Sequence, residues 1–396
     1  MKRFLYILPI LFLAACEGFF GTKTDIEFLD IPVFDDREIA YVPIQPVWDD
    51  FEYPVDIIAG WDELIYIADG ATEEIVSYDQ AGNELGRFAI PGLTAIAQDR
   101  RLELLAAGTF DTTINNIDYT LATIYRLSLE NGTDYGLKFA QIKSKIIHPY
   151  YFKQGIPTVS DTIVRFKGIG IRANNRYYVS RNGVNNNPLK FGGPDDAVLQ
   201  FDTDDTWLSI VPVNVTGFGQ FRDYFKKPQG LATRIQPPQT DEINLNTLDE
   251  FVYGSVDPEA VFRVQAIRFV AGSRGASFNQ IGFPALDTSI TDRIVYEPFR
   301  FTEPVDVTFG PLPSSFFFVV DAARDSVYQF TNNGYEGVAP PNDATGRLVN
   351  VSFGGTGAGL TQFNEPRGVA YLRDILFVAD AGNGRILRFK LTTDIE

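Results

Sequence analysis

Two short runs near the C-terminus decide the fold: residues 363–369 read FNEPRGV, and residues 378–386 read VADAGNGRI. The first run opens a strand at its proline, a position where a missing backbone N–H is tolerated. The apolar residues 375–378 form a second strand, and the glycines on either side of Asn383 allow a tight turn into a third. Residues 353–389 therefore predict a small antiparallel meander.

Weaker copies of this meander recur along the chain. Each copy combines short apolar strands with turn residues such as glycine, asparagine and aspartate. The copies cover residues 53–83, 93–127, 168–202, 227–264 and 303–334. Because one such sheet cannot bury both of its faces, repeated units of about 40 residues must stack against each other around an axis.

Through its FNEPRGV and VADAGNGRI runs, the segment 353–389 resembles an NHL repeat, the blade of one class of β-propeller. The resemblance implies an all-β fold, a six-bladed, NHL-like β-propeller. The last unit shows only three strands, so we expect its outer strand to come from residues 36–46 and to close the ring. Inserts, which would form loops suited to recognition, are expected near residues 130–165, 183–196, 203–226, 234–250 and 270–300.

The first sixteen residues have the layout of a secretory signal. Lys2 and Arg3 precede an apolar stretch, and residues 13–16 read LAAC. This ending resembles the lipobox of bacterial lipoproteins, which implies that Cys16 is lipidated after residues 1–15 are removed. We therefore predict a signal peptide (1–15), a lipidated tether (16–35) and a propeller (36–396). Multiple acyl chains suffice for stable anchoring.

The resemblance to lipoproteins of Gram-negative bacteria implies a place on the outer membrane. No acidic cluster directly follows Cys16, which favours the periplasmic face over the cell surface. The expected partners are other envelope proteins, with the membrane contacted through the lipid anchor. The net charge of −17 disfavours nucleic acid, because nucleic-acid binding needs a basic footprint.

The composition also limits the chemistry. Cys16 is the single cysteine and His148 the single histidine, so multi-histidine zinc sites and thiol chemistry are excluded. We expect no metal, no cofactor and no catalysis, and predict a non-catalytic binding or scaffold subunit of an envelope complex. Two alternatives stay open. One is a calcium-dependent lactonase of the gluconolactonase type, which needs only oxygen ligands; the other is a sugar or peptide binder serving an outer-membrane importer.

Several repeat residues predict structural roles within the blades. Asp69, Asp321 and Asp380 occupy the same point of three copies, which indicates bonding of a turn rather than one asymmetric site. Other polar residues belong to the NHL pattern of the last blade, and we expect intra-blade ion pairs from its arginines, with a ligand-binding rim as the alternative. They are Arg367, Asn383 and Arg385.

The insert at 138–153 is locally basic and aromatic on an acidic chain. It is the candidate partner-binding loop, although an ordinary solvated loop is the simpler interpretation. The residues proposed for contact are Lys143, Lys145, His148, Tyr150 and Tyr151.

Overall fold

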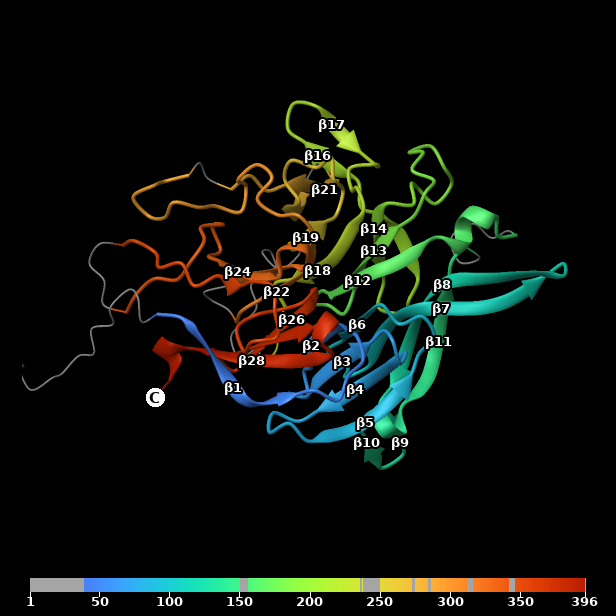
Figure 1. The fold of residues 1–396 in the computed structure, drawn as a ribbon. Coiled ribbons are helices and arrows are strands. Elements are labelled where there is room, and N and C mark those ends of the chain that lie inside the picture. The colour runs from blue at the N-terminus through green and yellow to red at the C-terminus, as the bar shows by residue number, and fades with distance from the viewer. Residues whose placement is uncertain are drawn as a thin grey trace, which may run out of the picture.

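The computed structural model describes residues 39–149, 156–235, 237, 250–272, 275–283, 286–311, 316–341 and 346–395. Six sheets, antiparallel except for one parallel pair at the outer edge of blade 4, surround a central axis and form an all-β, six-bladed β-propeller, which Figure 1 shows. The predicted signal, Cys16 and the tether lie outside the described residues. Within the described part, no helix is long and apolar enough to cross a bilayer.

Each blade is a meander whose first strand lies at the axis, and its fourth strand lies outermost in every blade except blade 4, where a hairpin is added outside it. Blades 1 to 3 consist of β2 (Pro54–Ala59), β3 (Ile65–Asp69), β4 (Glu74–Tyr78) and β5 (Glu84–Ala89); β6 (Ala95–Gln98), β7 (Leu104–Ile114), β8 (Ile117–Ser128) and β11 (Gln141–Ile147); and β12 (Arg165–Ile171), β13 (Tyr177–Asn182), β14 (Ala197–Phe201) and β15 (Trp207–Ile210).

Blades 4 to 6 follow the same order, and blade 4 is widened by a short hairpin. They consist of β18 (Pro228–Thr233), β19 (Phe251–Ser255), β20 (Val264–Gly272) and β21 (Gly275–Gln280), with β16 (Val213–Val215) and β17 (Gly219–Phe221); β22 (Pro304–Phe309), β23 (Phe317–Asp321), β24 (Ser326–Phe330) and β25 (Phe353–Gly354); and β26 (Pro366–Leu372), β27 (Ile375–Asp380), β28 (Arg385–Leu391) and β1 (Tyr41–Trp48).

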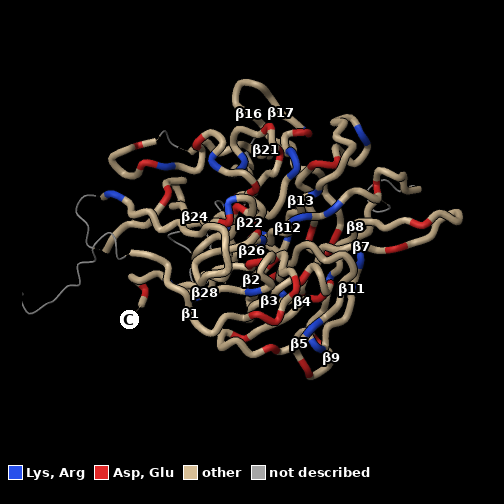
Figure 2. The backbone as a smooth tube through the Cα atoms, viewed as in Figure 1, with Lys and Arg blue, Asp and Glu red and all other residues tan. Residues whose placement is uncertain are grey.

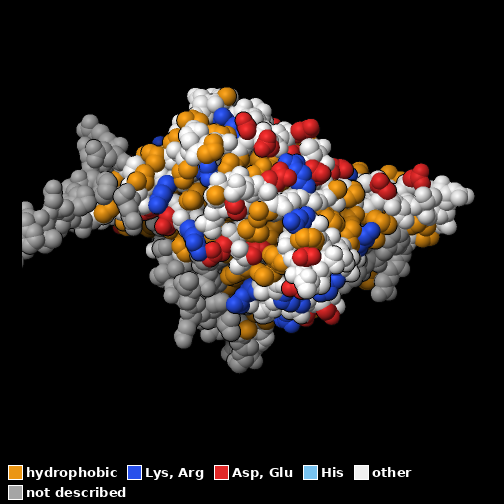
Figure 3. Space-filling view, turned by 90° about the horizontal axis from the view of Figure 1, so that it is seen from below, with side chains coloured by type: hydrophobic (Ala, Val, Ile, Leu, Met, Phe, Trp, Pro, Cys, Tyr) orange, Lys and Arg blue, Asp and Glu red, His pale blue; other side chains and the backbone are white. Residues whose placement is uncertain are grey.

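Short elements fill some connections. They are the pair β9 (Glu130–Asn131) and β10 (Asp134–Tyr135), and the 3-10 helices η2 (Leu137–Phe139), η3 (Val159–Thr162), η4 (Ala322–Arg324), η5 (Ala381–Asn383) and η6 (Thr392–Asp394). The hairpin of β7 and β8 is the longest in the described chain and stands out from the body at the right of Figures 1 and 3.

The N-terminal strand β1 closes the ring by pairing antiparallel with β28, the last strand of the chain. Tyr41 lies opposite Leu391, and Trp48 lies opposite Ile386. Trp48 also stacks on Tyr78 of blade 1, with 4.8 Å between the ring centroids. The predicted closure by an N-terminal strand is confirmed, although the strand continues past the expected residues 36–46.

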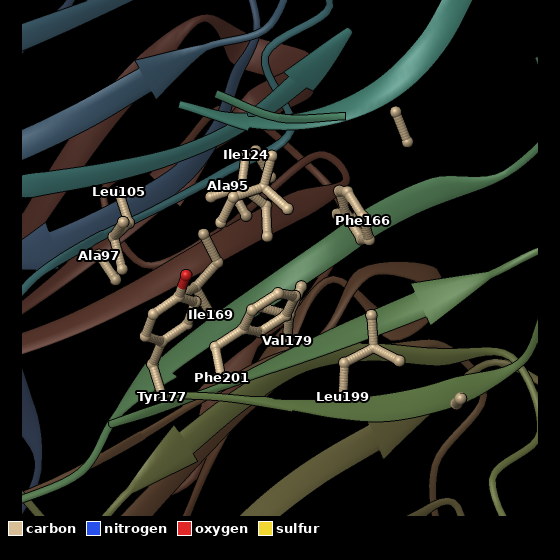
Figure 4. Close-up of a cluster of buried hydrophobic side chains, with 14 of the residues drawn as sticks. Ala95, Ala97, Leu105, Ile124, Phe166, Ile169, Tyr177, Val179, Leu199 and Phe201 are labelled. Carbon is tan, nitrogen blue, oxygen red and sulfur yellow. The ribbon is translucent and has the colours of Figure 1, made fainter. Parts of the chain in front are cut away.

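The cores lie between blades because the second strand of each sheet is buried on both faces. In β3, Ile65 and Ile67 pack in one cluster with Phe377 of blade 6. Tyr66 and Ala68 point the other way, into the cluster shared with blade 2. Figure 4 shows the corresponding layer between blades 2 and 3. Burial of both faces explains why these strands are continuous apolar runs.

The outer strands differ from the sequence-based expectation. Parts of three predicted inserts are strands: β11 completes blade 2, β15 completes blade 3, and β21 belongs to blade 4. No residue of β5 is fully buried, and in β11 only Ile146 is. A strand at a sheet edge meets solvent on one side, so its sequence lacks the apolar run that marks an inner strand.

Candidate functional site

Three second strands end in a fully buried aspartate: Asp69 in blade 1, Asp321 in blade 5 and Asp380 in blade 6. Each carboxylate accepts hydrogen bonds from backbone N–H groups in the segment that leads into the first strand of its own blade. In blade 6 the Asn364 N–H donates to Asp380 at 2.7 Å. These carboxylates brace three separate turns and do not converge on one ligand.

The other polar residues singled out from the sequence of blade 6 divide between the turn and the axis. Asn383 donates to Asp380 Oδ2 at 2.8 Å, and Arg385 Nε lies 2.7 Å from the same oxygen. Both residues therefore hold the turn together. Arg367 is placed elsewhere: it forms an ion pair with Glu365 and lines the channel at the centre of the ring.

Blade 3 departs from this scheme at the equivalent position. In blade 6, Pro366 is paired with Asp380 next to a β-bulge, and in blade 3 Phe166 is paired with Arg181 next to the corresponding bulge. Arg181 is thus the counterpart of the turn aspartates. Its side chain is fully buried, and burial lowers its pKa to about 10. The guanidinium still carries its positive charge at neutral pH and needs acceptors.

A loop of residues 183–196, named here the docking loop, supplies those acceptors. The Arg181 guanidinium donates to the carbonyl oxygens of Gly192, Pro194 and Asp195. The Asp195 carboxylate accepts from Asn185 N at 2.8 Å and forms an ion pair with Lys190. Because buried charge-assisted hydrogen bonds are stronger than neutral ones, the loop is fixed to the blade along its length.

A second aspartate joins the docking loop to blade 4. Asp196 accepts from Asn186 Nδ2 at 3.0 Å, and its own N–H donates to Asn186 Oδ1 at 2.7 Å. The same carboxylate accepts from the backbone N–H of Lys227, just before β18. Burial raises the pKa of Asp196, and these hydrogen bonds oppose that shift. The asparagines of the loop therefore serve its internal structure.

Large apolar side chains face solvent at the outer end of this braced loop. Leu189 is 86% exposed and Phe191 is 69% exposed. Phe218, at the tip of the neighbouring hairpin of β16 and β17, is 80% exposed. Arg222 follows that hairpin and donates to the carbonyl of Pro188, which links the two segments. Apolar groups presented to water on an ordered scaffold are typical of a contact surface.

The first strands of the six blades enclose a central channel of ≈ 770 Å³, which includes the part open to solvent. Most of its wall is apolar or glycine. The charged side chains of the wall are Asp56, Lys167, Asp306 and Arg367. Over the whole molecule, in contrast, acidic and basic residues are spread across all the blades, as Figure 2 shows.

The two channel carboxyls connect neighbouring blades. Asp56 Oδ2 accepts from Ile96 N of blade 2 at 2.7 Å, and Asp306 Oδ2 accepts from Val369 N of blade 6 at 2.8 Å. Burial raises the pKa of Asp56 to about 7. Burial, together with the charge of Asp56, raises the pKa of Asp306 well above its usual value. Near neutral pH these groups therefore carry less negative charge than ordinary carboxylates.

The two channel cations lie in opposite blades, Lys167 in blade 3 and Arg367 in blade 6, each one residue before a glycine of the inner strand. Among the described residues, Lys167 has no hydrogen bond or ion pair from its ammonium group. Burial lowers its pKa, and the positive charge of Arg367 lowers it further. The buried Nε of Arg367 has no acceptor within the described chain. Lys167 thus brings to the channel an ammonium group without a partner in the described part of the protein, and Arg367 adds a second positive charge to the same wall.

The lysines predicted to bind a partner lie on a strand and not on a loop. Residues 141–147 form β11, which pairs with β8. Lys143 forms an ion pair with Glu103, and the Lys145 ammonium lies 4.7 Å from the Phe110 ring centroid. The sequence-based interpretation of 138–153 as a loop is wrong for this part, because β11 is an edge strand with few apolar residues.

His148 follows β11 and is buried, at 1% exposure. Its Nε2 lies 3.5 Å from Asp161 Oδ1, and its ring meets Phe166 edge-on. A histidine enclosed in this way packs inside the protein and does not reach a partner. The other predicted contact residues, Tyr150 and Tyr151, lie outside the described residues.

Within the described chain, no group of three or more histidine, cysteine, aspartate and glutamate side chains is placed to hold a metal ion. A calcium-dependent lactonase would need several oxygen ligands around the axis. Asp56 and Asp306 are the channel carboxyls, both accept backbone N–H groups, and both share the channel with Lys167 and Arg367. Two positive charges oppose a divalent cation, so the described channel does not fit calcium.

No protein-family model matches the chain, and no curated protein matches it. Solved structures do resemble it. An auxiliary nutrient binding protein from Bacteroides thetaiotaomicron VPI-5482 is 13% identical, with a TM-score of 0.51 over 91% of this chain and 74% of that chain. The PQQ-bound form of aldose sugar dehydrogenase from Streptomyces coelicolor is 13% identical, with a TM-score of 0.47, 89% of this chain and 98% of that one being covered.

Virginiamycin B lyase from Staphylococcus aureus is 10% identical, with a TM-score of 0.44 over 89% of this chain and 100% of that chain. At 13% identity, the similarity to the nutrient binding protein shows the fold alone. Together with the six blades described above, it places this protein in the class of the six-bladed β-propellers.

Proposed function

We propose that this chain is a lipid-anchored, non-catalytic binding propeller of the bacterial outer membrane, facing the periplasm, and that its docking loop holds a partner protein of the envelope. The exposed, braced pair Leu189 and Phe191 carries this proposal. The sequence of residues 13–16, LAAC, supports anchoring through Cys16.

The energetics favour contact through this loop. Moving a leucine or phenylalanine side chain out of water stabilises a complex by about 1.5–3 kcal/mol per residue. Arg181 and Asp195 already hold the loop in one conformation, so little additional ordering entropy is lost on binding. We infer that the partner offers an apolar pocket into which these two side chains insert, as anchors at protein interfaces do.

The test uses the full-length chain in envelopes, with chemical cross-linking followed by affinity capture. Replacing Leu189→Asp together with Phe191→Asp places two charges in the contact. Recovery of the cross-linked partner is expected to fall at least about tenfold, which corresponds to 1.4 kcal/mol. Unfolding measurements on the purified variant verify that the blade stays folded.

A matched control carries Leu85→Asp on the outer strand of blade 1, where a leucine is 41% exposed but lies on no braced loop. This control is expected to recover the partner normally. Equal recovery with the double variant, or the absence of any specific partner in the unmodified strain, would refute docking through the loop. In the same preparations, Cys16→Ser is expected to move the protein from the membrane fraction to the soluble fraction.

A further inference from the structure

The mouth of the central channel combines two cations: Arg367, which interacts with Glu365 and Tyr53, and Lys167, which has no partner among the described residues. Lys167 is the third residue of β12 and Arg367 the second of β26, so both lie at the end of the channel where the inner strands begin. Val55, Thr94 and Val305 are the neighbouring wall residues from three other blades. The wall between the two charged groups is therefore mostly neutral.

In the described part of the chain, the polar groups next to Lys167 bond to other atoms, so its ammonium group stays free to bind a ligand. The nearby Thr94 hydroxyl donates at 2.8 Å to the carbonyl of Phe166, the residue before Lys167. Arg367 has one ion pair, to Glu365, and leaves its buried Nε without an acceptor in the described chain. Lys167 is half-buried, and a partly desolvated ammonium group without a protein partner adds little to stability, which favours a role in binding.

The acidic groups below the mouth do not neutralise these cations through contact. Asp56 and Asp306 direct oxygens at backbone N–H groups of adjacent strands. Glycine lies at this level in three blades: a Cβ at Gly368 would be 2.9 Å from Ile57 N, and one at Gly168 would be 2.9 Å from Gly230 Cα. Neighbouring inner strands therefore approach each other closely at this level, and much of the channel wall below the two cations is backbone.

We propose that the channel mouth is a binding site for the carboxylate group of a ligand, held between Lys167 and Arg367. Charge-assisted N–H donors on opposite walls suit a compact anion with two oxygens. A carboxylate can come from a sugar acid or from the C-terminus of a peptide, and both sources present the same group. The site is separate from the docking loop, so each can fail in experiment without the other.

The experiment measures binding to the purified full-length protein by calorimetry, with probes in matched pairs. D-glucuronate is compared with D-glucose, and a tripeptide with a free C-terminus is compared with its C-terminal amide. At least one acid is expected to bind and its neutral counterpart to bind at least about tenfold more weakly. Which pair responds identifies the source of the carboxylate. If no acid binds, or if acid and neutral forms bind equally, the proposal is wrong.

Two variants test whether Lys167 binds the carboxylate. Lys167→Met keeps the length of the side chain and removes the charge, so carboxylate binding is expected to weaken at least about tenfold. Because a half-buried charge without a partner among the described residues is removed, the thermal midpoint is expected to stay the same or rise. Lys226→Met is the control, since Lys226 is a half-exposed lysine paired with Asp223. Unchanged binding in Lys167→Met, or a marked loss of its thermal stability, would overturn the assignment.

Discussion

Blades 6 and 3 carry opposite charges at equivalent positions, where the second strand pairs with the first strand next to its β-bulge. Asp380 of blade 6 is a buried acceptor, and the N–H group of Asn364 in a short approach segment satisfies it. Arg181 of blade 3 is a buried donor, and the carbonyl groups of a long loop satisfy it. Blade 6 keeps the repeat and has a compact turn, whereas blade 3 departs from the repeat and displays Leu189 and Phe191.

The difference shows that the residue at this buried position matches the kind of connection beside it in each of the two blades. A carboxylate accepts from N–H groups, which a tight turn presents in a cluster. A guanidinium needs several carbonyl oxygens, which a loop that curves back over the side chain can offer. The position is structural in both blades, but only the second solution exposes new surface.

The largest expected effect comes from breaking the blade 6 arrangement. Asp380→Ala leaves the half-buried Arg385 without its ion pair and the Asn364 N–H without its acceptor. The free energy of unfolding is expected to fall by about 3–5 kcal/mol, measured by urea denaturation. Asp204→Ala, at an exposed aspartate of blade 3, is the control. A loss below about 1 kcal/mol for Asp380→Ala would contradict the bracing role.

A smaller and more local effect is expected in blade 3. Arg181→Met removes the donors for three loop carbonyls and is expected to destabilise the docking loop by about 1–3 kcal/mol. Hydrogen exchange should accelerate within residues 183–196, while the amides of β27 keep their protection. If exchange in the loop stays unchanged, or if β27 loses protection equally, Arg181 does not act on the loop in particular.

The smallest effect concerns the inner-strand position that follows Lys167 and Arg367. The residue at this position is the same in blades 3 and 6 and different in blade 1. Glycine fills this position at 168 and 368, but blade 1 has Asp56, whose pKa burial raises to about 7. Between about pH 4 and 7 the folded chain therefore binds more protons than the unfolded chain. The free energy of unfolding is expected to fall as the pH rises through this window, by at most about 1.4 kcal/mol per pH unit for this group.

Asp56→Asn tests this pH dependence by reducing the slope of the unfolding free energy between about pH 4 and 7. The slope does not vanish, because the pKa of Asp306 is raised as well, with Lys167 and Arg367 facing the same channel. Asp79→Asn is the control: hydrogen bonds from Asn83 lower the pKa of Asp79, so its contribution falls at lower pH. An unchanged slope in Asp56→Asn would show that Asp56 titrates normally.

The sequence predicts the parts of the fold that depend on burial from both sides. The second strands read as apolar runs, and the runs FNEPRGV and VADAGNGRI mark the turn that Asp380 braces. The closing strand could be expected because the last unit has only three strands. The outer strands, such as β11, could not be identified, because a half-exposed edge carries no distinctive pattern.

The candidate sites were harder to find from the sequence. The asparagines at 185–187 suggest an ordinary exposed loop, and only the pairing with Phe166 shows that Arg181 replaces a turn aspartate. Lys167 precedes Gly168 as Arg367 precedes Gly368, but Lys167 lies one residue before the recognisable copy at 168–202, so the repeat alone does not mark it. The Lys167 ammonium group lacks a partner in the described chain because of how the blades pack against each other, and no local sequence pattern predicts such packing.

The closure of blade 6 has a consequence for the order of folding. Ala40 N donates to Thr392 Oγ1 across 352 positions of sequence, and β1 meets its partner strand only when β28 exists. During synthesis the first strand is made long before the last, so five blades can form while the ring is still open. Contacts of such high sequence separation form slowly. A chain cut short before β28 would keep β1 unpaired, and proteases could recognise an unfinished product by that single exposed edge.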